Sequence, residues 1–110
     1  MDDRTLEALR GSIEKWEAIE RGDGQDLGIS NCPLCHLFVE ECCQDCPVGI
    51  TTGLYGCNGS PYGEFRRALT DAAGEVAVSI DEAPLDEASR LKRLARDERE
   101  FLESLLLLPA

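Results

Sequence analysis

The chain has 110 residues, of which 43% are hydrophobic but only 5% aromatic, and its formal net charge is −11. This length fits a single domain over residues 1–110, with a thin core that a metal ion or a disulfide would reinforce. No apolar run approaches the ~20 residues of a membrane span, and the charged start of the chain does not resemble a signal peptide, so we expect a cytoplasmic protein without membrane contact.

Positive charge is missing from the middle of the chain. No Lys or Arg occurs between Gly22 and Phe65, a stretch that contains six acidic residues. Proteins bind duplex DNA through basic surfaces that displace counterions from the phosphates. The composition therefore predicts no binding to duplex DNA, and the acidic surface favours a basic protein partner.

The first predicted element is an amphipathic helix over residues 4–21. Its apolar residues recur at spacings of three and four, as on one face of a helix; they are Leu6, Leu9, Ile13, Trp16 and Ile19. Gly22 offers a C-terminal stop, whereas Gly11 slightly weakens the helical pattern. A turn-rich loop follows over residues 22–31.

Residues 30–60 form a cysteine-rich module. Two C-x-x-C pairs begin at Cys32 and Cys43, and a further cysteine, Cys42, abuts the second pair. Each C-x-x-C turn directs two thiolates at one point, so two such pairs can complete a tetrahedral zinc site. Because a reducing compartment disfavours disulfides, we expect one structural Zn²⁺ ion. Its ligands would be four of five cysteines: Cys32, Cys35, Cys43, Cys46 and Cys57.

Other chemistries fit the same cluster less well. Four cysteines also hold a 4Fe-4S cluster, and a Pro after the last ligand, as in Cys46-Pro47, occurs in such proteins, so this cluster is the alternative cofactor. His36 completes a C-x-x-C-H haem signature, but the chain has no second His and no Met beyond Met1 as an axial ligand. A catalytic zinc ion keeps one position open and recruits His or carboxylate, whereas this cluster has surplus sulfur. We therefore expect no enzyme activity.

Residues 34–42 have helical character, and a clearer helix is predicted over residues 61–73. Ser60 and Pro61 mark the start of that helix as N-cap and first-turn residues. Because helix N-termini attract anions and Arg side chains suit phosphate, we regard Ser60, Arg66 and Arg67 as a candidate anion site beside the Gly-rich segment 53–59.

Residues 75–80 fit a short strand, an extended connector or a continuation of the preceding helix. The last helix is predicted over residues 84–107, with an apolar face toward the first helix. Its charged residues, Glu98 among them, alternate in sign as on a solvated helix face. The apolar end Leu105–Leu108 either packs under the first helix or contacts a partner, such as a second copy of the chain in a homodimer.

Five segments carry a resemblance to a known group of proteins: Lys15–Ile19, Asn31–Cys35, Cys43–Val48, Gly56–Tyr62 and Glu100–Leu106. In content and order they look like uncharacterised small cysteine-rich proteins encoded by tailed phages and prophages. The resemblance implies a viral accessory protein that acts in the cytoplasm of the bacterial host cell. It assigns neither a mechanism nor a set of ligands.

These features predict a predominantly α fold, a small helical domain around a central metal-bound cysteine-rich loop. The favoured function is that of a phage-type accessory protein that binds a host or phage protein and uses zinc as a structural staple. One alternative is a ligand- or nucleotide-sequestering protein that uses segment 53–59 with Arg66 and Arg67. Another is an iron–sulfur redox or sensing protein.

Overall fold

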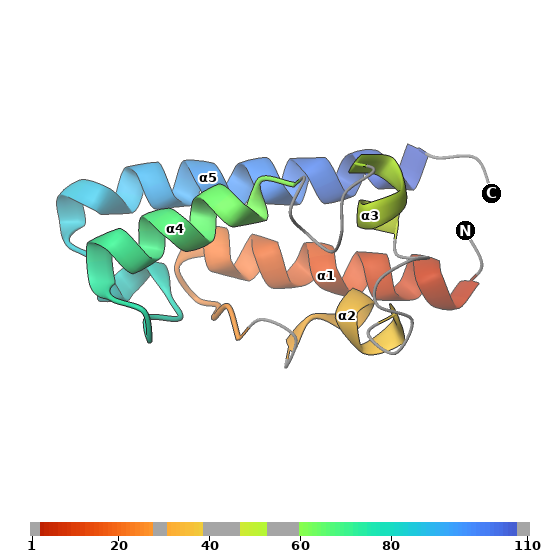
Figure 1. The fold of residues 1–110 in the computed structure, drawn as a ribbon, viewed down its shortest axis with the longest axis horizontal. Coiled ribbons are helices and arrows are strands. Elements are labelled where there is room, and N and C mark those ends of the chain that lie inside the picture. Colours follow the sequence, from red (N-terminus) through yellow and green to blue (C-terminus); the bar gives the residue numbers. More distant parts are fainter. Residues whose placement is uncertain (1–2, 28–30, 39–46, 53–59, 108–110) are drawn as a thin grey trace.

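The computed structural model describes residues 3–27, 31–38, 47–52 and 60–107. These residues are predominantly helical and include no strand, which confirms the predominantly α part of the predicted fold class. The metal-bound cysteine-rich loop stays a prediction. Two long helices, α1 (Asp3–Arg21) and α5 (Leu85–Ser104), run antiparallel along the length of the molecule (Figure 1). A 3-10 turn, η4 (Leu105–Leu107), follows α5.

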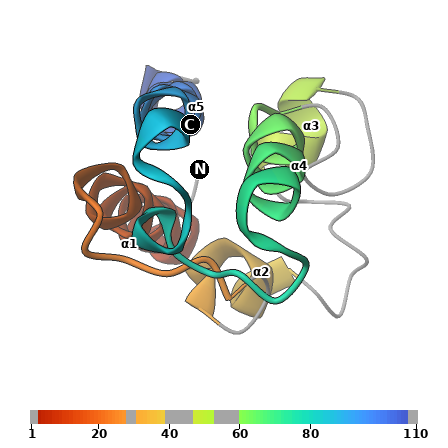
Figure 2. The same cartoon turned by 90° about the vertical axis from the view of Figure 1, so that its left-hand side faces the viewer.

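Shorter helices cover this pair. α4 (Tyr62–Ala73) packs along α5, α2 (Pro33–Phe38) lies against α1, and α3 (Pro47–Thr52) contacts η4. Figure 2 looks along the bundle and shows α1 and α5 on one side, α3 and α4 on the other, and α2 beneath them. None of the described helices is both long and apolar enough to cross a membrane.

α1 forms because its apolar residues share one face, on which Leu9, Ile13, Trp16 and Ile19 are buried. Gly22 ends the helix with a φ of 89°, a left-handed conformation that a residue without a Cβ adopts readily. The N–H of Gly22 donates to the carbonyl oxygen of Ile19 at 3.0 Å. The predicted first helix and its stop are confirmed.

α1 and α5 make the most extensive contact among the described elements, which confirms that the two terminal helices pack together. The buried apolar residues of α5 are Leu91, Leu94, Ala95 and Leu102. At the end of the chain, Leu105 is 1% exposed whereas Leu107 is 86% exposed. Leu105 thus belongs to the core, whereas Leu107 lies on the surface.

Aromatic side chains join α4 to α1. The Trp16 ring meets the rings of Tyr62 and Phe65 edge to face, with centroids 5.7 and 5.0 Å away. Phe65 and Leu69 of α4 are fully buried. Trp16 therefore anchors the core from α1, and α4 completes the apolar interior that α1 and α5 begin.

The segment between α4 and α5 is a connector with one 3-10 turn, η3 (Ile80–Glu82). The Glu82 carboxylate accepts the backbone N–H groups of Val78 and Ser79 at 2.6 and 2.8 Å, and these bonds lower its pKa. The two amides are consequently not available to a strand ladder. Of the three readings of residues 75–80, the extended connector is correct, and the strand and the helix continuation are wrong.

The short helices lie at the edges of the cysteine-rich region. α2 occupies the first part of the segment predicted to be helical, and residues 39–42 of that segment lie outside the described ranges. α3 is not indicated by the sequence pattern, because Pro47 and Gly49 favour turns. Pro47 nevertheless suits the first helical position, and Val48 is 1% exposed, so packing of this turn onto the core supports the helix.

The charged residues of α5 are mostly exposed, as predicted. Arg96 pairs with Glu100 at 3.7 Å along the helix, and Arg99 reaches across to Glu20 of α1 at 2.7 Å. Glu98 is the exception, because it is 2% exposed. It lies four residues from both Leu94 and Leu102 and so belongs to the buried face. The prediction of a solvated side chain is wrong at this position.

We predict that Leu102→Ala lowers the free energy of unfolding by about 2–5 kcal/mol, because it leaves a cavity between α1 and α5. Leu107→Ala is the matched control, since this leucine is 86% exposed, and should change it by less than about 0.5 kcal/mol. Urea unfolding of the two variants measures both values. Equal, small losses would contradict the packing of α5 described above.

Candidate functional site

The first C-x-x-C pair lies at the start of α2. Cys32 immediately precedes the helix and Cys35 belongs to its first turn, so their side chains come together, and the two thiols form a hydrogen bond. Both cysteines are half-buried and neither is in a disulfide. The Cys32 sulfur also lies 3.7 Å from the hydroxyl oxygen of Ser12 on α1. Two adjacent thiols therefore lie close to the surface of α1.

Gly11 and Ser12 of α1 determine where this pair lies. A Cβ atom at Gly11 would come within 2.9 Å of the Pro33 ring, so the glycine allows α2 to approach α1 closely. The Ser12 hydroxyl, buried between the helices, accepts the backbone N–H of Leu34 at 3.4 Å. Gly11, which weakened the predicted helical pattern, thus has a packing role, because it lets α2 pack closely against α1.

The surroundings of Cys32 favour its thiolate. The hydrogen bond from the Cys35 thiol is the largest influence, and the Cys35 amide, Ser12 and the Lys15 ammonium group act in the same direction. Burial of Cys32 opposes them, but the net effect lowers its pKa from 9.0 to about 5. The thiolate is the form of cysteine that binds metal ions and acts as a nucleophile. The lowered pKa therefore favours the form of Cys32 that either role would require.

The other predicted ligands, Cys43, Cys46 and Cys57, lie outside the described residues, as does Cys42. Within the described ranges, no three His, Cys, Asp or Glu side chains gather closely enough to hold a metal ion. His36 is exposed on α2. The described part of the chain thus brings together two of the five candidate sulfurs, and both the metal site and its four ligands stay predictions.

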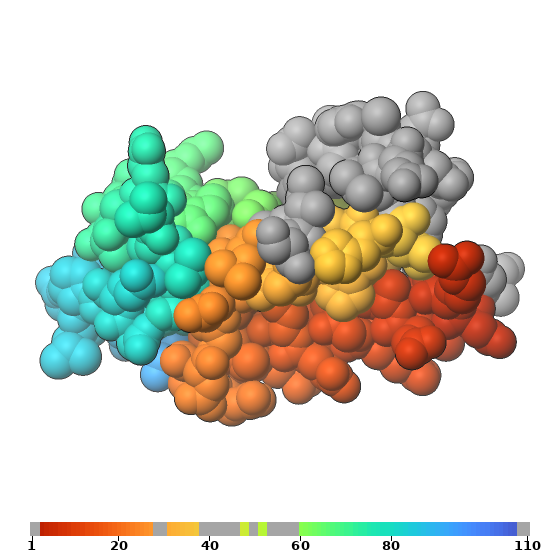
Figure 3. Space-filling view, turned by 90° about the horizontal axis from the view of Figure 1, so that it is seen from below, coloured from red at the N-terminus to blue at the C-terminus, as the bar shows by residue number. Residues whose placement is uncertain are grey.

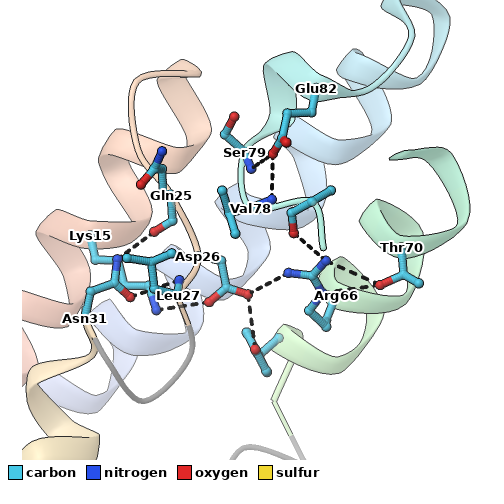
Figure 4. A network of polar contacts seen from close by, with 12 residues as sticks. Lys15, Gln25, Asp26, Leu27, Asn31, Arg66, Thr70, Val78, Ser79 and Glu82 are labelled. Carbon is cyan, nitrogen blue, oxygen red and sulfur yellow. Dashed lines mark hydrogen bonds and ion pairs between the residues drawn. The ribbon is translucent and has the colours of Figure 1, made fainter. Parts of the chain in front are cut away.

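A buried ion network lies beside this pair and is centred on Asp26, whose side chain is 1% exposed (Figure 4). One carboxylate oxygen accepts from the Lys15 ammonium group at 3.2 Å. The other accepts from the Tyr62 hydroxyl at 3.1 Å and from the Arg66 guanidinium group at 3.4 Å. Asp26 therefore ties the loop after α1 to both α1 and α4.

Further hydrogen bonds extend this network in two directions. Arg66 donates to the carbonyl oxygen of Ala77 at 2.7 Å. The backbone N–H of Asp26 donates to the carbonyl oxygen of Val78 at 2.7 Å. The network thus also binds the connector between α4 and α5. On the other side, the Asn31 amide donates to the carbonyl oxygen of Gln25 at 2.7 Å. Asn31 directly precedes Cys32, so the same loop holds the chain where it enters the cysteine pair (Figure 4).

Glu98 brings a second buried carboxylate to the same region. It accepts hydrogen bonds from the Ser60 hydroxyl and the Tyr62 backbone N–H at the start of α4. Its other oxygen, Oε1, has no hydrogen-bond partner among the described residues. Burial, reinforced by the nearby charge of Cys32, raises the pKa of Glu98 to about 7 in spite of these hydrogen bonds and of Lys15.

The three residues of the candidate anion site are placed differently from one another. Ser60 is buried beside Glu98, so an internal carboxylate lies at the start of α4. Arg66 is engaged by Asp26, Thr70 and the Ala77 carbonyl group, whereas Arg67 is exposed. Ser60 and Arg66 thus make contacts within the fold, and the phosphate site stays a prediction. The Gly-rich segment 53–59 lies outside the described residues.

A groove of about 890 Å³ lies between α1 and α2, the helices that form much of the face in Figure 3. Its α1 side carries charges of both signs, with Arg4 and Arg10 next to Glu7 and Glu14. Pro33 and His36 line the α2 side. The mixture of charges gives the groove no clear preference for an anionic or a cationic ligand.

Sequence reasoning missed the residues that surround the cysteine pair. Asp26 lies in a loop rich in Gly and Asp, where an acidic residue usually faces solvent. Lys15 lies next to Trp16 and is only 7% exposed at its side chain, which no local pattern indicates. Glu98 could have been found, because it repeats the four-residue spacing of the apolar face of α5.

We predict that Asp26→Asn lowers the free energy of unfolding by about 3–5 kcal/mol, because Lys15 loses the carboxylate that compensates its buried charge and Arg66 loses an ion pair. Asp23→Asn is the control. Asp23 pairs with Arg21 at 3.5 Å, but both side chains are more than 60% exposed, so this change should cost less than about 1 kcal/mol. Urea unfolding of both variants measures the difference. Similar losses for the two would refute the special role of Asp26.

Comparison with models of protein families, with curated proteins and with solved structures gives no match to this chain.

Proposed function

We propose that this chain is a small non-enzymatic binding protein whose fold is fastened by one structural zinc ion. The observation that carries the proposal is the adjacency of the Cys32 and Cys35 thiols on the surface of α1, with the pKa of Cys32 lowered to about 5. Two thiolates from one C-x-x-C turn occupy two corners of a zinc tetrahedron. The other two corners are assigned to two of three cysteines: Cys43, Cys46 and Cys57.

Zinc suits the surroundings of this pair. Lys15 and Ser12 stabilise negative charge on Cys32 before a metal ion arrives, which reduces the cost of removing the thiol proton. A site with sulfur ligands alone is closed to water and substrate, which fits a structural role and not a catalytic one. A 4Fe-4S cluster would use the same thiolates and is the alternative that colour and iron content distinguish.

The proposed activity is the binding of another protein. A net charge of −11 favours a basic partner and disfavours duplex DNA. The exposed Leu106 and Leu107 at the end of α5 provide an apolar point of contact, either for that partner or for a second copy in a homodimer. The resemblance to small cysteine-rich phage proteins supports a viral accessory role directed at a host or phage protein in the bacterial cytoplasm.

We predict one tightly bound zinc ion per chain in protein purified without oxygen. Cys32→Ser and Cys35→Ser should each lose zinc and impair folding, because the free energy of binding a structural zinc ion, on the order of 10 kcal/mol, is also free energy of folding. Elemental analysis, with far-ultraviolet circular dichroism of each variant, measures both effects.

The matched control is Cys42→Ser, which should retain zinc and structure because Cys42 is not among the proposed ligands. Zinc well below one equivalent in the wild-type protein would contradict the proposal. A brown protein with stoichiometric iron and sulfide would replace zinc with the iron–sulfur alternative. Loss of metal from Cys42→Ser alone would show that the assigned ligands are wrong.

A further inference from the structure

Glu98 lies where four parts of the fold meet. It belongs to α5, contacts Ser60 and Tyr62 at the start of α4, and lies within electrostatic range of Lys15 on α1 and of Cys32 before α2. Glu98 is 2% exposed, and its Oε1 atom has no hydrogen-bond partner among the described residues. Buried carboxylates normally have partners for both oxygens, so this arrangement calls for a physical explanation.

The charged and the neutral form of Glu98 differ in how well their buried surroundings stabilise them. The carboxylate gains from the Ser60 hydroxyl, the Tyr62 amide and the positive end of α4, a helix of 12 residues. The carboxylate also loses stability, because its Oε1 atom is removed from water and accepts no hydrogen bond from the described residues. The neutral acid avoids most of that loss and keeps the same packing. Burial has the larger effect and raises the pKa of Glu98 to about 7.

We propose that Glu98 is a proton-operated latch between α5 and the start of α4. The protonated side chain stays packed against Ser60 and Tyr62. When the proton leaves, the carboxylate takes up water, and the contact between α5 and the first turn of α4 opens. This device needs no metal ion and goes beyond the zinc site proposed above.

The charged groups that face Glu98 come from two other elements. Lys15 on α1 favours the carboxylate, and Cys32 before α2 opposes it. On α4, the groups in contact are the Ser60 hydroxyl and the Tyr62 amide, and the Tyr62 hydroxyl donates to Asp26. The Lys15 ammonium group lies 3.2 Å from the Asp26 carboxylate. The proton of Glu98 is then the one that changes at this contact near pH 7.

The direction of the pH effect follows from the two states of the chain. The pKa of Glu98 is about 7 in the folded protein, against an ordinary value of 4.5, so the folded state binds the proton more tightly. The resulting stabilisation is complete below about pH 4.5 and disappears as the pH rises through about 7. For these two values, the contribution of Glu98 to the unfolding constant rises about 30-fold between roughly pH 5.5 and 8.5.

The test compares full-length wild-type protein with Glu98→Gln, which keeps the shape and removes the titration. Glu100→Gln, on the exposed side of α5, is the control. From pH 5.5 to 8.5 the unfolding constant of wild type and of Glu100→Gln should rise about 30-fold relative to that of Glu98→Gln. Hydrogen exchange of the Tyr62 amide, relative to that of Ile13 on α1, should accelerate over the same range in wild type and not in Glu98→Gln.

Identical pH profiles for wild type and Glu98→Gln would overturn the proposal. So would a Tyr62 amide whose exchange relative to Ile13 does not change with pH. If Glu98→Gln does not fold, the carboxyl ¹³C signal of Glu98 in the wild-type protein decides the matter. A midpoint near pH 7 supports the latch, and a midpoint at or below the ordinary value of about 4.5 refutes it.

Discussion

The buried carboxylate of Asp26 holds together segments that the apolar core alone does not fix. It pairs with Lys15 of α1 and Arg66 of α4, and it accepts the hydroxyl of Tyr62. A buried ion pair adds little net stability compared with apolar packing, but removal of one partner leaves an uncompensated charge. The network therefore selects one arrangement of residues 22–27 after α1, and the hydrogen bond from Asn31 to Gln25 ties the residue before Cys32 to this segment.

Lys15 connects this network to the candidate metal site. Its ammonium group contacts Asp26 at 3.2 Å and also helps to lower the pKa of Cys32 and to limit the rise in the pKa of Glu98. One cation thus acts on three acidic groups that come from the loop, the cysteine pair and α5. The apolar core between α1, α4 and α5 supplies the free energy of folding, whereas this polar region specifies where the cysteine pair lies.

Much of the fold follows from local patterns. Helices α1, α4 and α5 were predictable because their apolar residues repeat at helical spacing and because Gly22 and Pro61 lie at helix ends, where Gly and Pro are common. The polar interior was not, because Asp26, Lys15 and Glu98 are buried by partners far away in the sequence. The same limit applies to Arg66, whose ion pair with Asp26 no local pattern indicates. α3 escaped prediction because tertiary packing of Val48 overrides the turn signals around it.

The central claim is that the Cys32–Cys35 pair provides half of an all-sulfur zinc site. X-ray absorption at the zinc edge of the purified protein tests it most directly. We predict four sulfur neighbours at about 2.3 Å and no nitrogen or oxygen ligand in the first coordination shell. A shell that contains nitrogen or oxygen, or a spectrum unchanged when both Cys32 and Cys35 are replaced by serine, would contradict this account.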